Sequence, residues 1–225
     1  MFRFDVVPAG DSALHVQLPE RIDPLENAWC IRLARSIEQH LGSAVRDVVV
    51  GYCSVTAYFE PLLTDPAWLE ARIREMAEAI EEVVDSTGGV VDVPVCYGGA
   101  FGPDIGDIAR FGGCSEAEVI AIHTAATYRV YLVGFVPGFP YLAEVNRRIA
   151  APRRRSPRTA VPPGSVAIAG GQTGIYPSST PGGWNIIGRT PVLPYDPSRI
   201  EPFLFRPGDR VRFFAITAEE FARAS

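Results

Sequence analysis

The sequence predicts two domains, an α+β domain followed by a mainly-β domain. Strand-like and helix-like stretches follow one another in the order β-β-α-β-β-α before residue 90. Only 5 of the 20 prolines precede that residue, and after it short apolar runs are separated by glycine and proline, as in β-barrels and sandwiches. We therefore expect domains at residues 1–89 and 90–225.

The first domain is expected to open with two strands and a helix. Apolar alternation predicts strands over residues 2–7 and 13–18. Asp23 and Pro24 pair an N-cap residue with a proline suited to the first helical position. Apolar residues then recur at helical spacing as far as Gly42, a residue type that commonly follows the last turn.

A second helix is predicted to pack on the same sheet. Strands are expected over residues 45–50 and 54–59, and Asp65 begins a helix whose apolar stripe continues to Val84. Residues 90–96 follow as another strand. A β-α-β-β-α order that runs into a strand is that of a ferredoxin-like domain, so we expect an antiparallel sheet covered by two helices.

The second domain is expected to combine two short helices with many strands. The helices are predicted over residues 104–111 and 115–123, the latter opened by a capping box of Ser115 and Glu118. Short apolar runs between turns predict strands over residues 128–135, 166–169, 184–187, 192–195, 203–205 and 211–216. Many short strands with few helices indicate a closed or nearly closed β-barrel.

Composition excludes several classes of function. The formal charge of −5 gives no general attraction to nucleic acid, and no apolar run is long enough for a membrane span. The N-terminus has no signal-peptide pattern, so we expect a cytoplasmic protein in which the four widely spaced cysteines are reduced and bind no metal. All 21 basic residues are arginine, which excludes a P-loop, a Schiff-base lysine and biotin attachment.

Residues 152–191 form the candidate binding region. They hold 7 glycines and 7 prolines in 40 residues, yet their polar and aromatic residues do not repeat. We interpret the region as tightly turned β-structure in which glycines let the backbone or a ligand come close. An arginine-rich run at residues 147–158 leads into it, and this run is an anion clamp, a solvated loop or a docking surface for an acidic partner. Arg158 and Arg189, each held between turn residues, are the best candidates for binding an anion.

Four other side chains are candidates on chemical grounds. Gln172 offers a donor and an acceptor, which suits a lactam or amide. Tyr176 and Trp184 could wall an apolar pocket or instead fill the end of the barrel. His123 near a helix end could act in acid–base catalysis or serve as a structural core histidine.

Several segments of the chain together form a specific pattern. They are His123-Thr124, YRVY at 128–131, GFVPGFPYL at 134–142, PRT at 157–159, VPPGSV at 161–166, AGGQTGIYP at 169–177 and PGGWNIIGRTP at 181–191. With these motifs the chain resembles the family of the 5-oxoprolinase B subunit, also called allophanate hydrolase subunit 1. The likeness covers almost the whole chain and is dense between residues 97 and 191.

The resemblance implies a cyclophilin-like barrel as the second domain and a heteromeric enzyme as the assembly. Members of the family work with the two other subunits of 5-oxoprolinase. These are the C subunit, which has a related barrel fold, and the A subunit. Together they use ATP to open 5-oxo-L-proline to L-glutamate, so we expect ATP, with Mg²⁺, at a site shared with a partner. The family also resembles part of urea carboxylase and an inhibitor of a sporulation histidine kinase, so carboxyl transfer or amide hydrolysis, and kinase inhibition, are the alternatives.

Motif position and chemistry together nominate five site residues. We expect Arg158 and Arg189 to hold anions, Gln172 to bind the lactam and Tyr176 to line the substrate site. We expect His123 to act on a proton or on a neighbouring backbone group, so His123 and Gln172 are the candidate catalytic residues.

Overall fold

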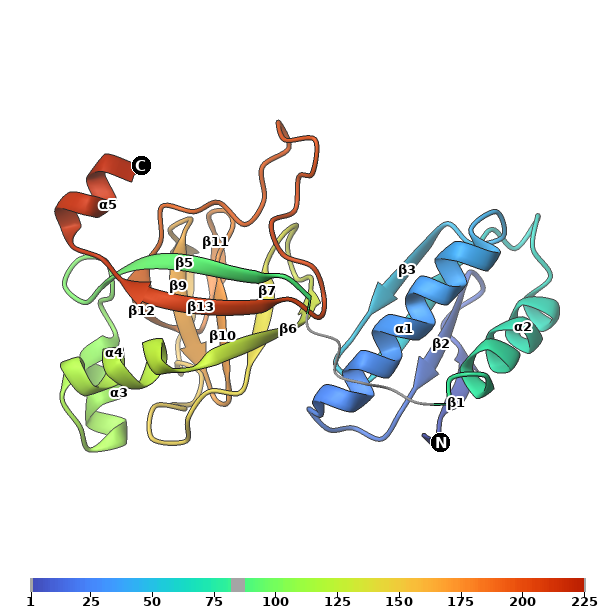
Figure 1. The fold of residues 1–225 in the computed structure, drawn as a ribbon, viewed down its shortest axis with the longest axis horizontal. Helices are drawn as coiled ribbons and strands as arrows, with labels where there is room; N and C mark the ends of the chain where they lie inside the picture. Colours follow the sequence, from blue (N-terminus) through green and yellow to red (C-terminus); the bar gives the residue numbers. More distant parts are fainter. Residues whose placement is uncertain (1, 82–87, 225) are drawn as a thin grey trace. The chain divides into compact units, whose positions relative to one another are not determined.

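The computed structural model describes residues 2–81 and 88–224 and divides the chain into two compact units, residues 1–86 and 87–225 (Figure 1). The first unit is a four-stranded antiparallel sheet with two helices. The sheet has the order β1-β2-β4-β3, formed by Asp5–Pro8, Ala13–Gln17, Ser54–Tyr58 and Asp47–Val50 respectively. The second unit is mainly β, so the α+β and mainly-β classes predicted from the sequence are confirmed.

One face of the sheet packs against helices α1 (Pro24–Leu41) and α2 (Pro66–Glu78). Both helices begin as predicted: the Asp23 carboxylate accepts hydrogen bonds from the amides of Leu25 and Glu26, and Asp65 accepts one from Ala67. The α2 helix ends at Glu78, earlier than the predicted apolar stripe, and Val84 lies outside the described residues.

The strand expected to complete the ferredoxin-like order belongs to the other unit. β5 (Val90–Tyr97) pairs in the barrel, and β1 occupies the edge of the first sheet beside β2. A tight hairpin at the N-terminus therefore supplies the fourth strand that the sequence order assigned to residues 90–96.

The second unit is built on a closed barrel of seven strands in the order β10-β7-β6-β13-β5-β12-β9. In chain order they are β5, β6 (Thr127–Val133), β7 (Pro140–Ala143), β9 (Ser165–Ala169), β10 (Gln172–Ile175), β12 (Asn185–Arg189) and β13 (Arg210–Ala215). Neighbouring strands are antiparallel except β13, which runs parallel to β5.

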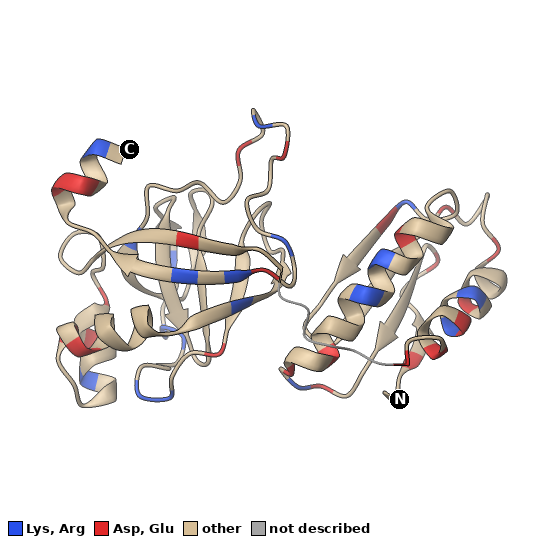
Figure 2. Ribbon diagram, viewed as in Figure 1, with Lys and Arg blue, Asp and Glu red and all other residues tan. Residues whose placement is uncertain are grey.

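Smaller elements surround the barrel. A two-stranded sheet of β8 (Arg158–Val161) and β11 (Thr180–Gly182) lies outside the barrel's own ladder. The helices are α3 (Ile105–Gly112), α4 (Glu116–Ala125) and α5 (Ala218–Ala224), of which α4 opens with the predicted capping box. Figure 2 shows acidic and basic positions side by side on the adjacent strands β5 and β13, where Asp92 and Arg212 form a bidentate ion pair.

Two predicted strands are wrong. Residues 192–195 and 203–205 form an extended loop joined by a single bridge between Tyr195 and Phe203. Pro194 and Pro202 have no amide hydrogen to donate, so a continuous ladder cannot form there. Among the described residues, no helix has the length and apolarity needed to cross a membrane.

Candidate functional site

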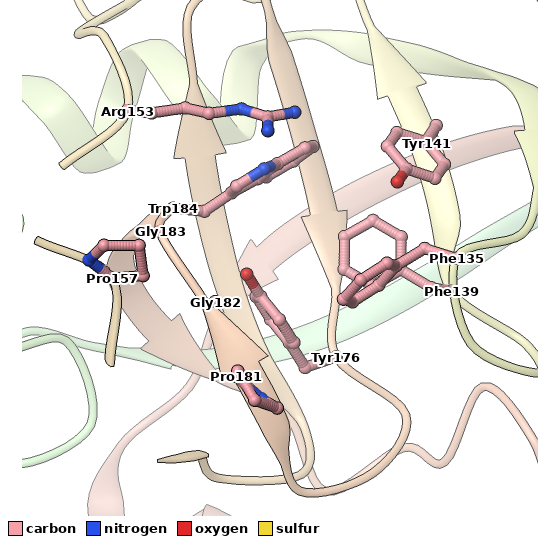
Figure 3. Close-up of a pocket in the computed structure, with 10 residues that line it drawn as sticks. All are labelled: Phe135, Phe139, Tyr141, Arg153, Pro157, Tyr176, Pro181, Gly182, Gly183 and Trp184. Carbon is pink, nitrogen blue, oxygen red and sulfur yellow. The ribbon is translucent and has the colours of Figure 1, made fainter. Parts of the chain in front are cut away.

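A pocket of about 250 Å³ lies on the outer wall of the barrel, and we name it the aromatic pocket (Figure 3). Its residues come from β7 and the turn before it, from β11 and the segments on either side of it, and from the segment before β8. They are Phe135, Phe139, Tyr141, Arg153, Pro157, Tyr176, Pro181, Gly182, Gly183 and Trp184.

Phe139 forms the base of the aromatic pocket. Its ring is 2% exposed and meets the rings of Tyr176 and Trp184 edge-on, with centroids 5.1 and 5.4 Å away. The Tyr141 ring lies 4.8 Å from Phe139 on the opposite wall. Such edge-to-face contacts hold the rings in fixed orientations, so the pocket exists before any ligand enters.

Two glycines make this packing possible. A Cβ atom on Gly174 would meet the Phe139 ring at 2.8 Å, and one on Gly182 would overlap the hydroxyl group of Tyr176. At these two glycines of the candidate binding region, aromatic side chains of the pocket therefore lie directly on the backbone.

Arg153 supplies the pocket's positive charge. Its guanidinium carbon lies 5.9 Å from the centroid of the Trp184 ring, and Figure 3 shows the guanidinium extending alongside that ring toward Tyr141. Arg153 makes no ion pair or side-chain hydrogen bond with the residues that the structure describes. Burial raises the pKa values of Tyr141 and Tyr176, and the charge of Arg153 only partly opposes this, so both phenols stay protonated near neutral pH.

A buried carboxylate lies behind the pocket wall. Asp104 is 3% exposed and accepts two hydrogen bonds from Arg158 at 2.8 Å, one from Arg154 at 2.6 Å and one from the amide of Ile186 at 2.8 Å. Arg158, expected to hold an anion of the substrate, is thus bound to an anion of the protein. This hydrogen bonding to Asp104 raises the pKa of Arg158.

His123 lies in the barrel core and not at the pocket. It is fully buried between Tyr97, which lies 2.8 Å from Nδ1, and Thr173, which lies 3.1 Å from Nε2, and it stacks on Phe213. Burial lowers the pKa of His123 to about 3, so the ring is neutral at physiological pH. This geometry favours the structural alternative for His123.

Gln172 and Arg189 also lie away from the aromatic pocket. Gln172 begins β10 opposite Ala143, and its side chain makes no hydrogen bond within the described part of the chain. Nε of Arg189 donates a 2.8 Å hydrogen bond to the Pro163 carbonyl, and its guanidinium carbon lies 6.0 Å from the Phe221 ring of α5.

Of the five residues nominated from the sequence, only Tyr176 lines the pocket, with Arg158 one layer behind it. Arg153 was not nominated, because six arginines in the run at residues 147–158 have the same chemistry and their order in the sequence does not separate them. Phe139 and Tyr141 were not nominated either, although the GFVPGFPYL motif that contains them supplies one wall of the pocket.

Comparison with known proteins gives a consistent set of relatives. Residues 4–205 match the model of the family described as "Carboxyltransferase domain, subdomain C and D". The chain is 38% identical over 97% of its length to the 5-oxoprolinase B subunit of Bacillus subtilis, covering 95% of that protein. It is 30% identical over 52% of its length to a putative urea carboxylase of Emericella nidulans, of which the match covers 10%.

The fold recurs within a longer polypeptide. The crystal structure of TTHA0988 superposes on 92% of this chain with a TM-score of 0.81 and 36% identity, and this match covers 40% of the TTHA0988 chain. The same architecture therefore occurs both as a separate chain and as one part of a larger one.

Proposed function

Because the chain belongs to the family of the 5-oxoprolinase B subunit, within the carboxyltransferase-domain family, we propose that it is one component of a heteromeric enzyme that opens 5-oxo-L-proline to L-glutamate. The structural observation that supports this most directly is a small, preformed aromatic pocket with one arginine at its wall. A flat five-membered lactam that bears a carboxylate suits such a pocket.

The pocket offers a complementary group to each part of this substrate. The guanidinium of Arg153 would pair with the carboxylate, and a charge-assisted hydrogen bond of this kind is worth about 1.5–3 kcal/mol. The aromatic side chains that line the pocket would cover the lactam ring, and the protonated phenol of Tyr141 or Tyr176 would donate to the lactam oxygen. Arg158 would support the site indirectly, through Asp104.

ATP would be handled mainly by the partner proteins of the complex. Among the described residues no group of three or more acidic, histidine or cysteine side chains could hold a metal ion. In the glycine turn at residues 98–102, the amides of Phe101 and Gly102 both donate to the Gly98 carbonyl. Two amides of this turn are thus already used within it, so the turn is a poor phosphate-binding loop and we assign ATP binding to the partner proteins.

Activity of the complex is the test. The purified chain, alone and mixed with its candidate partners, would be assayed for ATP hydrolysis that depends on 5-oxo-L-proline. We expect turnover only in the mixture and binding of 5-oxo-L-proline by the complex. Folded and associated components that neither bind 5-oxo-L-proline nor hydrolyse ATP in its presence would rule the proposal out.

Carboxyl transfer is the second candidate, because the matching family model is that of a carboxyltransferase domain and one relative is named as a putative urea carboxylase. It would require a biotin carrier on another chain, since this chain has no lysine to carry biotin. Urea-dependent ATP turnover that needs an added biotin carrier, with no response to 5-oxo-L-proline, would favour this candidate.

A further inference from the structure

We propose that Asp104 is a positioning residue that selects Arg153, out of the neighbouring arginines, as the anion contact of the aromatic pocket. The inference rests on the proposed function, because it assigns Arg153 to the substrate carboxylate. It adds a buried residue that does not touch the pocket and that no motif of the sequence singled out.

Asp104 binds the segment that follows Arg153 at two points. Arg154 follows Arg153 directly and donates to Oδ1 of Asp104 at 2.6 Å, while Arg158 binds both carboxylate oxygens at 2.8 Å. The side chains of Arg154 and Arg158 are 31% and 25% exposed, against 4% for Asp104, so this ion-pair cluster is largely shielded from water. Partly buried, bidentate pairs of this kind are held more rigidly than surface ion pairs.

The carboxylate is itself anchored to the barrel. Oδ2 of Asp104 accepts a hydrogen bond from the Ile186 amide at 2.8 Å, and the Asp104 amide donates to the Ile186 carbonyl at 2.9 Å. Asp104 thus pairs with β12 much as a neighbouring strand residue would. Since Trp184 lies two residues before Ile186, the anchor and the pocket wall belong to the same short piece of chain.

Two further hydrogen bonds, which involve the backbone on either side of Arg153, hold the same segment in place. The Arg154 amide donates to the Gly183 carbonyl at 2.8 Å, and the Asn185 side chain donates to the Pro152 carbonyl at 2.9 Å. Arg153 lies between these contacts, and its guanidinium is directed over Trp184. The result is a segment in which Arg154 and Arg158 point to Asp104 and Arg153 points to the pocket.

The charge of Asp104 explains how this residue keeps Arg153 at the pocket. The guanidinium groups of Arg154 and Arg158 share one carboxylate, so the cluster keeps a surplus of positive charge next to the pocket. If Asp104 lost its charge, Arg154 and Arg158 would be left partly buried without a counter-ion and would move toward water, and the segment would move with them. Arg153 would then lose its fixed place beside Trp184.

The test combines two variants and two ligands in the reconstituted complex. Asp104→Asn removes the charge at nearly constant shape, and Arg153→Ala removes the proposed contact. KM for 5-oxo-L-proline is compared with Ki for 2-pyrrolidinone, the same lactam ring without the carboxylate. We expect each variant to raise KM by about tenfold or more and to leave Ki within about twofold, because only the carboxylate interaction is affected.

A double-mutant cycle isolates the coupling. In the Arg153→Ala background, Asp104→Asn should raise KM no further, since there is no longer an arginine to position. Asp92→Asn is the matched control: it breaks a bidentate arginine–aspartate pair on β5 and β13 of the same unit and should change neither constant. Fully additive effects on KM, or an equal rise of Ki in Asp104→Asn, would show that Asp104 only supports the fold.

Limited trypsin digestion gives a readout that needs no ligand. Arg153, Arg154 and Arg155 lie in one run, so release of the segment from Asp104 lets trypsin bind the backbone at several cleavage sites. Asp104→Asn should speed cleavage within residues 153–155 by about tenfold, and Asp92→Asn should not. If Asp104→Asn does not fold, Arg154→Met removes the adjacent contact and replaces it in both assays, with cleavage followed after Arg153 and Arg155.

The outcomes separate the two proposals. A complex that binds no 5-oxo-L-proline while Asp104→Asn still accelerates cleavage would overturn the function and leave the ion-pair cluster as a structural device. If the complex that carries Asp104→Asn binds 5-oxo-L-proline normally and trypsin cleaves residues 153–155 no faster, the proposed role of Asp104 is overturned. The proposed 5-oxoprolinase function would still stand.

Discussion

Tyr97 and His123 form a buried hydrogen bond that fixes the protonation of the imidazole ring. The Thr173 hydroxyl donates to the Ala167 carbonyl at 3.1 Å, so it accepts from Nε2 of His123. Nδ1 must then be the unprotonated nitrogen, and it accepts from the Tyr97 hydroxyl at 2.8 Å. Both nitrogens are used inside the barrel core, which links α4, β5 and β10.

The first prediction concerns stability at acid pH. The pKa of His123 is about 3 in the folded chain and near 6.5 when unfolded, so below about pH 6.5 the unfolded state binds the extra proton. Stability should therefore fall as pH decreases, by up to about 1.4 kcal/mol per pH unit from this group alone. His123→Gln should lower stability near neutral pH by about 1–3 kcal/mol and make the loss on acidification shallower.

Urea unfolding at several pH values between about 7.5 and 4 would measure this, with the exposed His40→Gln as the control. An acid dependence in His123→Gln as steep as that of the unchanged chain would contradict the assignment of a buried neutral histidine.

The second prediction concerns charge at the pocket. Arg153→Ala should raise KM for 5-oxo-L-proline by about tenfold to a hundredfold with little change in kcat, because it removes a contact made equally in the ground and transition states. Arg155→Ala is the matched control from the same arginine run, since Arg155 is exposed and does not line the pocket. Equal effects of the two variants would mean that the run acts only through its overall charge.

The third prediction concerns Gln172, the residue that the sequence favours for lactam binding. Since its side chain does not line the aromatic pocket, Gln172→Ala should leave KM for 5-oxo-L-proline within about twofold. Steady-state kinetics of the reconstituted complex would measure it. A large loss of activity in this variant would place the substrate elsewhere on the barrel.

The fourth prediction concerns Gly182. A methyl group there would overlap the Tyr176 hydroxyl, so Gly182→Ala should displace Tyr176, narrow the pocket and cost about 1–3 kcal/mol of stability. Gly171→Ala is the control, because a Cβ on Gly171 meets no atom within 4 Å. Thermal unfolding and binding of 2-pyrrolidinone would both be measured, and a Gly182→Ala chain indistinguishable from the control would show that Tyr176 does not need its present position.

The sequence predicted most helices and their first residues because capping chemistry is local: Asp23, Asp65 and Ser115 each bond to amides two or three residues away. It did not predict β7, β8, β10 and β11, which have only three or four residues each and contain or adjoin glycine and proline. Such strands are held by their neighbours in the sheet and not by their own propensity.

The site was harder to predict for a similar reason. Arg158 has the chemistry of an anion-binding residue, and only the fold shows that Asp104, 54 positions earlier, already occupies it. Likewise, Arg153 cannot be told from Arg155 until the tertiary structure places Arg153 beside Trp184 at the pocket and Arg155 away from it.

The position of β13 determines the order in which the two units can fold during synthesis on the ribosome. β13 lies between β5 and β6 and hydrogen-bonds to both, yet it is made more than 100 residues after β5 begins at Val90. The barrel therefore cannot close until residues 210–215 have left the exit tunnel, whereas every strand and helix of the first unit is complete by Glu78. During synthesis the nascent chain should carry one finished unit and one open, edge-exposed sheet, and chaperones would meet it in that form.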